Sequence, residues 1–491
     1  MAERRGKAFL DTAAVTARLG RYADLVGDWS AFVSAMVASR PTCMVANRPR
    51  LSRDHLAALC RAEGLPVDEV GWTRDALRVP PDVRPGRWWP HQAGLFQVQE
   101  EASLLPVHVL APRPGERVLD LCAAPGGKAA QIAVSLGRTG TVVANDKSGQ
   151  RLAGMRDKAK RLGLLNLTMT VHDGADFPVA AGPFDAVLAD VPCSGEGTQF
   201  AEGASFATQD KQFRHKLTGQ QRALLRRALR LVRPGGRVVY ATCSLAPEEN
   251  EAVVDAILRE QGEAVRLVPL HVPGLSARPG LTAWAEQAFL PELSGALRLW
   301  PQDTGTGGFF VALLQRTDGS DPDAHRRAMP DAAALGAPAT IESDLATLRK
   351  HFGLPADTFD GLKFHVRGDE VHATAADHLP APRPRTAASG IPFLKRAGRW
   401  PKPTTAAAMW LGGAATRNVI DLDRDQRTAY QARREFVASA EQIRKCPATG
   451  YVLLRYAGLT LGAAFLTDRD PPRVRSEFPR IWVPTIYRDR S

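Results

Sequence analysis

Short apolar runs alternate with helical patterns through the middle of the chain. Five runs rich in Val and Leu follow Glu116, namely RVLDL, TVVAN, LTMTV, FDAVLAD and RVVYAT. Segments with apolar residues at helical spacing separate them, such as KAAQIAVSLG, GQRLAGMRDKAKRLG and TGQQRALLRRALRLV. This alternation predicts a mostly parallel sheet that helices cover on both faces, with ligands at the carboxyl ends of its strands.

The pattern at the N-terminus predicts a smaller α+β module. DWSAFVSAMV has the spacing of an amphipathic helix, and TCMVANRP is typical of a short strand that ends at a proline. LSRDHLAALCRAEG predicts a second helix, with Ser52 as its N-cap and Gly64 as its stop. We therefore predict an α+β module over residues 1–105, followed by the α/β domain over residues 106–316.

The C-terminal third has a different composition. Residues 317–340 are rich in Asp, Ala, Gly and Pro and are predicted to form a linker. Residues 379–405 form a second Pro-rich stretch. Within residues 341–491 we expect a helix near AYQARREFVASAEQI and strands at GYVLLRYAG and LTLGAAFL. These patterns predict a small β-rich domain.

Composition excludes several classes of protein. Hydrophobic residues make up 44% of the 491 residues and charged residues 24%, which excludes collagen-like, coiled-coil and wholly disordered chains. No apolar run approaches the ~20 residues that span a bilayer, and the N-terminus lacks the apolar core of a signal peptide. We expect a cytoplasmic protein that is monomeric and does not contact a membrane.

The positive charge is concentrated near the C-terminus. The formal net charge is +12, and residues 383–491 hold 20 Lys and Arg against 9 Asp and Glu. The remaining residues hold 44 Lys and Arg against 43 Asp and Glu. A basic region beside a neutral one indicates a polyanionic partner such as nucleic acid, although basic surfaces also arise from solubility. Charge alone leaves both interpretations open.

The cysteine pattern indicates free thiols. No two cysteines form a C-x-x-C pair, and no two histidines have zinc-finger spacing, so we expect neither a metal site nor a disulfide framework. The cysteines are Cys43, Cys60, Cys122, Cys193, Cys243 and Cys446.

A turn of small residues follows the first strand of the α/β domain, within VLDLCAAPGGKAAQIAV. It comprises Cys122, Ala123, Ala124, Pro125, Gly126 and Gly127, and Lys128 opens the next helix. Small residues let a ligand approach the backbone, and the N-terminus of a helix favours negative charge. An ordinary tight turn is the alternative, because the turn is neither G-x-G-x-x-G nor a Walker loop.

Acidic residues stand where three of the strands end. Asp146 follows TVVAN, Asp173 comes just after LTMTV, and Asp190 ends FDAVLAD. An acid after the second strand of such a sheet suits a ribose diol, so three acids on one edge predict a nucleoside cofactor. Arg151, on the following helix, is either a solvated arginine or a cofactor contact.

Two cysteines belong to the same sheet edge. Cys193 comes just past the fourth strand, and Cys243 just past the fifth. A thiolate with a lowered pKa is a good nucleophile, so both thiols are candidates for covalent chemistry. Spacing alone does not choose between them.

Three motifs carry a resemblance to a known family. CAAPGGK (residues 122–128), DVPCSGEG (190–197) and TCSLAPEENE (242–251), in this order and spacing, resemble those of the Sun-type RNA cytosine-C5 methyltransferases. The resemblance covers residues 88–314, including the approach segment GLFQVQEEAS. GYVLLRYAGLTLGAAFL followed by RVRSEFPR is similar to a PUA-like domain. The implied fold is a Rossmann-like class I methyltransferase sheet between an N-terminal RNA-binding module and a C-terminal PUA-like domain.

The resemblance also implies roles for the site residues. Cys243 would attack C6 of cytosine, Cys193 would assist release of the product, and Asp190 would hydrogen-bond the cytosine. S-adenosylmethionine would be the cofactor. Residues 122–128 together with Asp146, Asp173 and Asp190 would hold it. Cys193 as the nucleophile is the alternative, because DNA cytosine-C5 methyltransferases place theirs in a similar Pro-Cys motif.

The implied substrate is a structured RNA whose target base is unpaired. The length and the C-terminal extension favour a bacterial 16S rRNA enzyme slightly, with a tRNA enzyme of the same family as the alternative. A non-catalytic RNA-binding assembly factor on the same scaffold is a further alternative. A DNA methyltransferase would need a target-recognition region between its motifs, and this chain has short segments there.

Five further residues receive structural interpretations. Glu248, Glu249 and Glu251 are expected to be helix-start acids that complement the helix dipole. Trp88 and Trp89 are expected to pack in a core, although tryptophans also stack on bases.

Overall fold

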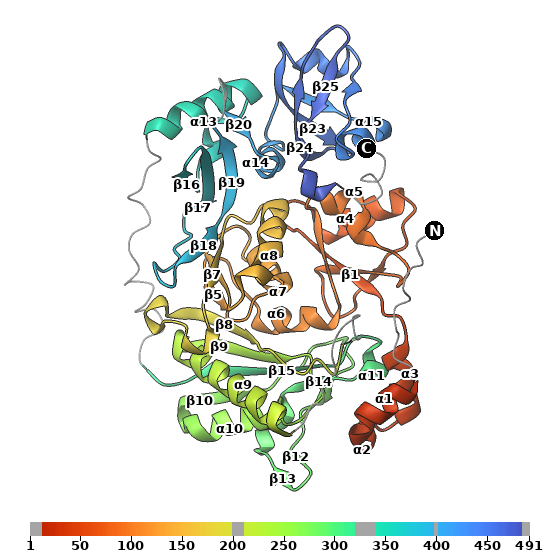
Figure 1. Cartoon of the computed structure of the whole chain (residues 1–491), viewed down its shortest axis with the longest axis vertical. Helices are drawn as coiled ribbons and strands as arrows, with labels where there is room; N and C mark the ends of the chain where they lie inside the picture. Colours follow the sequence, from red (N-terminus) through yellow and green to blue (C-terminus); the bar gives the residue numbers. More distant parts are fainter. Residues whose placement is uncertain (1–11, 199–210, 320–338, 397–400, 484–491) are drawn as a thin grey trace.

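A large mixed sheet forms the middle of the molecule in a computed structural model that describes residues 12–198, 211–319, 339–396 and 401–483 (Figure 1). Five parallel strands follow the order β7-β6-β5-β8-β9. They are β5 (Arg117–Asp120), β6 (Thr141–Asp146), β7 (Leu167–Val171), β8 (Phe184–Asp190) and β9 (Val232–Thr242). All five of the predicted apolar runs are therefore strands, and the predicted α/β fold class is confirmed.

Further strands widen the sheet beyond β9. β15 runs antiparallel to β9, and β14 and β10 pair with β15. Their bounds are β10 (Val265–Val268), β11 (Arg278–Pro279), β14 (Leu297–Leu299) and β15 (Phe309–Arg316). A separate hairpin consists of β12 (Ala283–Trp284) and β13 (Gln287–Ala288).

Helices cover both faces of the parallel strands. Consecutive side chains of a strand point to opposite faces, and Val118 and Leu119 of β5 accordingly lie in two different hydrophobic cores. One core contains α6 (Leu105–Leu110), α7 (Gly127–Ser135) and α8 (Gly149–Leu162). The other contains α9 (Lys211–Leu231) and α10 (Glu251–Gln261). This double burial explains why the strands are apolar at almost every position.

The N-terminal region consists of a helical part and a small sheet. The helical part contains α1 (Thr12–Leu19), α2 (Ala23–Val26) and α3 (Trp29–Val37). It packs on Leu245 and Trp300 of the central domain. The sheet has the order β2-β3-β1-β4. Its strands are β1 (Thr42–Ala46), β2 (Asp68–Glu69), β3 (Ala76–Val79) and β4 (Phe96–Gln99). The helices α4 (Arg53–Ala62) and α5 (Trp89–Gln92) lie between them in the sequence.

Two local predictions for this region are confirmed. Ser52 caps α4, with its hydroxyl oxygen accepting a hydrogen bond from the His55 amide at 3.2 Å. Trp89 is buried and meets Tyr456 of the C-terminal region edge to face. Trp88 is half-buried and packs against the core of the small sheet.

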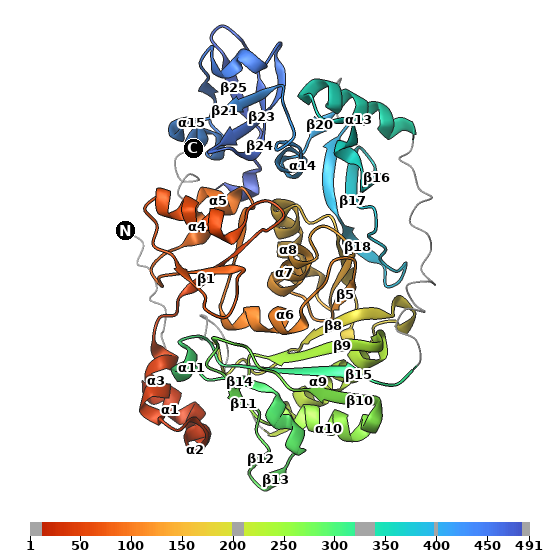
Figure 2. The same cartoon turned by 180° about the vertical axis from the view of Figure 1, so that it is seen from behind.

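The C-terminal region contains two further sheets (Figure 2), and the second includes the strands predicted at GYVLLRYAG and LTLGAAFL. The first follows α13 (Ala339–Phe352) and has the order β16-β17-β19-β20, and the second has the order β21-β23-β24-β25-β22. The first contains β16 (Leu362–Arg367), β17 (Glu370–Ala375), β19 (Ile391–Lys395) and β20 (Lys402–Pro403). The second contains β21 (Val419–Asp421), β22 (Phe436–Val437), β23 (Gly450–Tyr456), β24 (Leu459–Leu466) and β25 (Arg473–Ser476). The helices beside them are α14 (Thr405–Leu411) and α15 (Arg424–Gln431).

The prediction of a helix near AYQARREFVASAEQI is largely wrong. α15 ends at Gln431, after a capping box formed by Asp423 and Gln426 at its start. Arg433 then adopts a φ of 59°, a left-handed conformation that does not continue a helix. The next residues form β22, which pairs with β25. Tertiary pairing therefore overrides the helical propensity of this segment.

A strand from the Pro-rich stretch completes the central sheet. β18 (Thr386–Ser389) pairs antiparallel with β7. His378 lies next to this contact, with its Nε2 at 2.7 Å from the hydroxyl of Thr168. The C-terminal region is thus built into the edge of the central domain.

A membrane span is not found among the residues that the structure describes. None of their helices combines the length and the apolar composition that crossing a bilayer requires.

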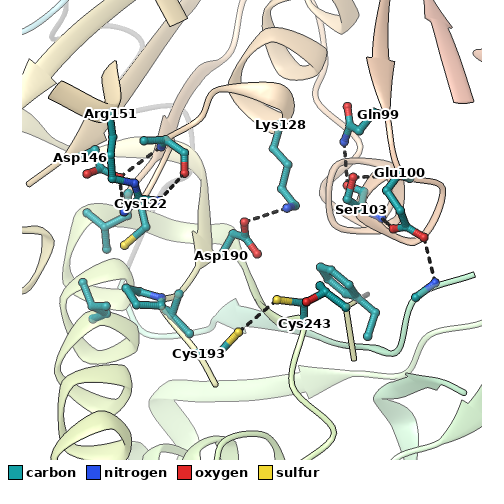
Figure 3. Close-up of a pocket in the computed structure, with 18 of the residues that line it drawn as sticks. Gln99, Glu100, Ser103, Cys122, Lys128, Asp146, Arg151, Asp190, Cys193 and Cys243 are labelled. Carbon is teal, nitrogen blue, oxygen red and sulfur yellow. Dashed lines mark hydrogen bonds and ion pairs between the residues drawn. The ribbon is translucent and has the colours of Figure 1, made fainter. Parts of the chain in front are cut away.

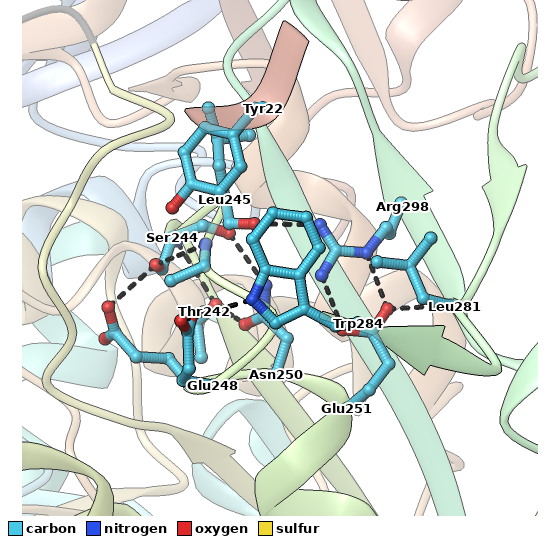
Figure 4. A network of polar contacts seen from close by, with 12 residues as sticks. Tyr22, Thr242, Ser244, Leu245, Glu248, Asn250, Glu251, Leu281, Trp284 and Arg298 are labelled. Atoms are coloured by element: carbon cyan, nitrogen blue, oxygen red, sulfur yellow. Dashed lines mark hydrogen bonds and ion pairs between the residues drawn. The ribbon is translucent and has the colours of Figure 1, made fainter. Parts of the chain in front are cut away.

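Glu248 and Glu249 precede α10 and Glu251 is its first residue, as expected of helix-start acids, and all three also have specific partners. Figure 4 shows Glu248 and Glu251 with their partners Trp284 and Arg298. Glu248 pairs with Arg21 at 2.6 Å and accepts a hydrogen bond from the Trp284 indole. Glu251 pairs with Arg298 at 2.5 Å, and both side chains are almost fully buried. Glu249 is also buried, and it accepts a hydrogen bond from the Ser194 amide, next to Cys193.

We predict that Arg298→Met destabilises the chain by about 3–5 kcal/mol, because it leaves the Glu251 carboxylate buried without its ion-pair partner. Urea unfolding of the full chain, followed by Trp fluorescence, measures the loss. Arg226→Met is the matched control, since Arg226 pairs with the half-exposed Glu260 and its loss should change stability by about 1 kcal/mol or less. Equal effects of the two substitutions would contradict the prediction.

Candidate active site

A pocket of about 850 Å³ opens at the carboxyl ends of the parallel strands. It lies where β5 is flanked by β6 on one side and β8 on the other, the position at which sheets of this class bind ligands. Its walls include side chains from the strand ends, from α7 and from the N-terminal region (Figure 3).

The turn of small residues forms one wall of the pocket. Cys122 and Ala124 line it, whereas Ala123 and Gly126 are buried behind it and Pro125 is exposed. Gly126 has a φ of 92°, and a Cβ at this position would lie 2.6 Å from the Met155 side chain. Glycine is therefore required here for the backbone conformation and for the close packing of α8. Gly127 opens α7 directly after this turn.

Asp146 is tied to the turn by backbone and ionic contacts. It is buried, and its Oδ2 accepts a hydrogen bond from the Ala124 amide at 3.2 Å. Its Oδ1 accepts another from the Ser148 amide at 2.9 Å. Arg151 lies 3.6 Å from Asp146 and donates to the Ala124 carbonyl at 2.8 Å. Arg151 is thus an exposed residue of the pocket wall that contacts the turn, and a cofactor contact by it stays a prediction.

Asp173 lies farther out along the same edge. It lines the pocket but is exposed, and its carboxylate accepts a hydrogen bond from the Ala175 amide at 2.9 Å. Six of the predicted cofactor residues therefore line this one pocket: Cys122, Ala124, Lys128, Asp146, Asp173 and Asp190.

Lys128 and Asp190 form an ion pair at 2.7 Å inside the pocket. Burial lowers the pKa of Lys128, but the neighbouring Asp190 carboxylate outweighs it, so the pKa ends above its ordinary value. Lys128 therefore stays a cation at neutral pH. It places positive charge in the pocket and does not act as a base.

Cys193 and Cys243 face each other across the pocket floor. Their Sγ atoms are 3.3 Å apart although 50 residues separate them in the sequence. The contact with Cys193 lowers the pKa of the Cys243 thiol, burial and the Asp190 carboxylate oppose this, and Lys128 lowers it further, so the net shift is downward. The same contact, followed by burial, raises the pKa of Cys193. Of the two thiols, Cys243 therefore has the lower pKa and loses its proton more readily.

These contacts give the pocket a defined chemistry. Cys193 and Cys243 place two thiols side by side, that of Cys243 with a lowered pKa, and Lys128 and Asp190 form an ion pair beside them. Covalent addition to an electron-poor carbon is the reaction that such a set of groups supports.

Comparison with known proteins identifies the family. A family model described as "16S rRNA methyltransferase RsmB/F" matches residues 107–315. The "Ribosomal RNA small subunit methyltransferase F" of Aeromonas salmonicida (strain A449) is 31% identical over 444 residues, covering 84% of this chain and 86% of that protein. The chain belongs to the RsmB/F family.

Other relatives match the RsmB/F domain and its surroundings. The "28S rRNA (cytosine-C(5))-methyltransferase" of Mus musculus is 36% identical over 301 residues, or 60% of this chain. The chain spans 37% of the length of that mouse protein. The solved structure of a "Methyltransferase Homolog Protein from Pyrococcus Horikoshii" is 31% identical with a TM-score of 0.55, covering 62% of this chain and 98% of the other.

The N-terminal region adds residues to the pocket that the sequence did not single out. Arg40 lines it and donates to the Gly197 carbonyl at 3.2 Å. Glu100 lines it and accepts a hydrogen bond from the Gly307 amide at 2.8 Å. Glu100 belongs to the GLFQVQEEAS segment, so the resemblance marked its neighbourhood, whereas no sequence signal marked Arg40.

Asp120 is a buried acid just below the RsmB/F pocket. It ends β5, it is 1% exposed, and neither of its carboxyl oxygens has a side-chain partner among the described residues. Burial raises the pKa of Asp120 to about 8, and the nearby Asp190 carboxylate adds to this increase. The folded protein therefore holds a proton on Asp120 at neutral pH.

We predict that Asp120→Asn stabilises the chain increasingly, relative to wild type, as the pH rises from 5 to 8.5. Because the pKa of Asp120 is raised, the folded wild type keeps this proton at pH values where the unfolded chain has released it. The free energy of unfolding of the wild type therefore falls as the pH rises towards about 8, whereas Asn carries no such proton. Urea unfolding of both proteins at several pH values gives the difference.

Asp157→Asn is the control for this series, because Asp157 is a partly exposed residue on α8. Its effect should be independent of pH over the same range. A constant difference between wild type and Asp120→Asn would show that Asp120 is ionised throughout, contrary to the prediction.

Proposed function

We propose that this chain transfers a methyl group from S-adenosylmethionine to C5 of a cytidine in ribosomal RNA. The observation that carries the proposal is the contact between Cys193 and Cys243, at 3.3 Å, beside the Lys128–Asp190 pair. The names of the relatives support it, since those of mouse and Aeromonas salmonicida both specify rRNA methyltransferases and the mouse name specifies cytosine C5.

The donor set of the pocket fits S-adenosylmethionine. The volume of about 850 Å³ falls within the range of about 300–1,000 Å³ typical of small-molecule sites. Asp146 is placed after the second parallel strand, where a carboxylate suits a ribose diol, and Asp173 and Asp190 suit the cationic end of this molecule. The bound cofactor would supply an electrophilic methyl group.

The residues of this chain would then act on the base in two stages. The Cys243 thiolate would add to C6 of the cytosine, forming a C–S bond and pushing electrons towards C5, which is otherwise a poor nucleophile. Asp190, fixed by Lys128, would hydrogen-bond the ring. After methylation a base would take the C5 proton, and its bonding electrons would re-form the C5–C6 double bond as the C6–S bond breaks. Cys193 would assist this release from its position beside Cys243. The target base must leave its stack to reach the thiols.

The remaining regions would present the RNA. Residues 1–105 would form an RNA-binding module, and residues 341–491, which include a PUA-like part, would supply sequence-independent phosphate contacts from the basic stretch after residue 383. We further propose that the chain acts as a monomer in the cytoplasm. All six cysteines are free, as expected in a reducing compartment.

Bisulfite sequencing of total RNA, from cells with and without the gene, tests the proposal. We predict that one ribosomal cytosine loses its methyl group and that the wild-type gene restores it. Cys243→Ala should not restore it, because the nucleophile is absent. Cys193→Ala should accumulate a covalent RNA–protein adduct, visible as a nuclease-sensitive shift on a denaturing gel.

Cys60→Ala is the matched control, because this thiol is buried in the small N-terminal sheet module and away from the pocket. It should restore methylation fully. An RNA pool in which no cytosine changes would refute the proposed activity. A trapped adduct with Cys243→Ala instead of Cys193→Ala would reverse the roles of the two thiols.

A further inference from the structure

Glu249 is a fully buried carboxylate that contacts the loops after β8 and β9. It is 0% exposed. Its Oε2 accepts hydrogen bonds from the Ser194 amide and from the Gln221 side chain, each at 2.9 Å, and its Oε1 accepts one from the Ser244 hydroxyl at 2.9 Å. Three donors therefore converge on this one carboxylate.

The donors come from the two loops that carry the cysteines. Ser194 directly follows Cys193, and Ser244 directly follows Cys243. The hydroxyls of the two serines also lie 2.9 Å apart. A backbone hydrogen bond from Gly197 to the Cys243 carbonyl, at 2.8 Å, joins the same loops farther along. Glu249 is thus the side chain that binds to both loops next to the thiols.

Gln221 fixes the carboxylate from the helix side. Its amide group donates to Glu249 and also to the Pro192 carbonyl, at 2.9 Å in both cases. Pro192 immediately precedes Cys193, so α9, Glu249 and the Cys193 loop form one connected network. No ion pair to Glu249 occurs among the residues that the structure describes, so hydrogen bonds are its polar contacts there.

We propose that Glu249 is a positioning residue that holds the Cys193 thiol against the Cys243 thiol. Its catalytic consequence rests on the proposed function, since the contact between the thiols matters there for attack and for release. The positioning itself is a property of the folded chain and is measurable without RNA.

The network distinguishes a geometric role from an acid–base role. In Glu249→Gln, the amide oxygen still accepts from Ser194 and Gln221, and the amide nitrogen donates to the Ser244 hydroxyl, which then donates to Ser194. Every hydrogen bond therefore has a counterpart. Glu249→Ala removes all three acceptor contacts. A positioning role predicts that Gln substitutes for Glu and that Ala does not.

Alkylation of Cys243 by iodoacetamide in the full chain, followed by peptide mass spectrometry across a pH series, tests the proposal. Iodoacetamide reacts with the thiolate, so the midpoint of the rate profile reports the pKa of Cys243. The midpoint in Cys193→Ala gives the pKa of Cys243 in the absence of the hydrogen bond between the two thiols. We expect Glu249→Ala to raise the midpoint towards this value by about one pH unit, or about tenfold slower alkylation below the midpoint.

Three further variants complete the series. Glu249→Gln should keep the wild-type midpoint. Glu248→Ala is the control on the same turn, because Glu248 contacts Arg21 and Trp284 instead of the cysteine loops, and it should also keep the wild-type midpoint. Ser244→Ala removes one arm of the network and should shift the midpoint in the same direction as Glu249→Ala, by less.

The outcomes separate the two proposals. An unchanged midpoint in folded Glu249→Ala, or a shifted one in Glu249→Gln, would overturn the positioning role. If Glu249→Ala does not fold, Ser244→Ala and Glu249→Gln decide by the same criteria. Midpoints that follow the expectation, in a wild-type protein that methylates no RNA, would uphold the positioning role and refute the proposed function. Methylation by the wild type, together with an unchanged midpoint in every variant, would uphold the proposed function and refute the positioning role.

Discussion

The parallel pairing of β8 with β9 is the constraint on which the rest of the site depends. Asp190 of β8 lies opposite Ala241 of β9, so the loops that follow the two strands leave the sheet side by side. Cys193 and Cys243 come three and two residues after this pair of partners. A shift of the register by one residue would turn the side chains of a strand to the opposite face. The buried apolar faces of both strands therefore fix the position of the thiols as well as the core.

Charged and neutral groups in and beneath the pocket influence one another. Lys128 stays cationic because Asp190 lies 2.7 Å away. Asp120, buried without a side-chain partner, is held neutral by its surroundings. The Cys243 thiolate is then favoured by a thiol donor and a cation. A buried carboxylate at Asp120 would add negative charge beneath this thiolate, so the proton on Asp120 and the reactivity of Cys243 are electrostatically linked.

The sequence predicted the parts of this arrangement that depend on local pattern. Alternating apolar runs and helical segments identified the five parallel strands, and strand ends placed the acids and both thiols on one edge. Contacts between distant segments were not predictable. Nothing in a Pro-rich stretch indicates that β18 pairs with β7, and nothing in the TCSLAPEENE motif distinguishes Glu249, which joins two loops, from Glu248, which contacts Arg21. Those roles depend on which residues the fold brings together, and a pattern along the chain does not contain that information.

The C-terminal region is docked on the rest of the chain at two separated places. β18 extends the central sheet at β7. Farther away, Gln431 donates to Gln92 at 2.9 Å, and Arg50 donates to the Thr460 carbonyl at 3.0 Å. Two attachments fix an orientation, whereas one would leave a hinge. Phosphate contacts from the basic C-terminal region would therefore hold an RNA at a set distance and direction from Cys243. Non-specific electrostatic affinity could in this way contribute to the choice of the nucleotide that enters the pocket.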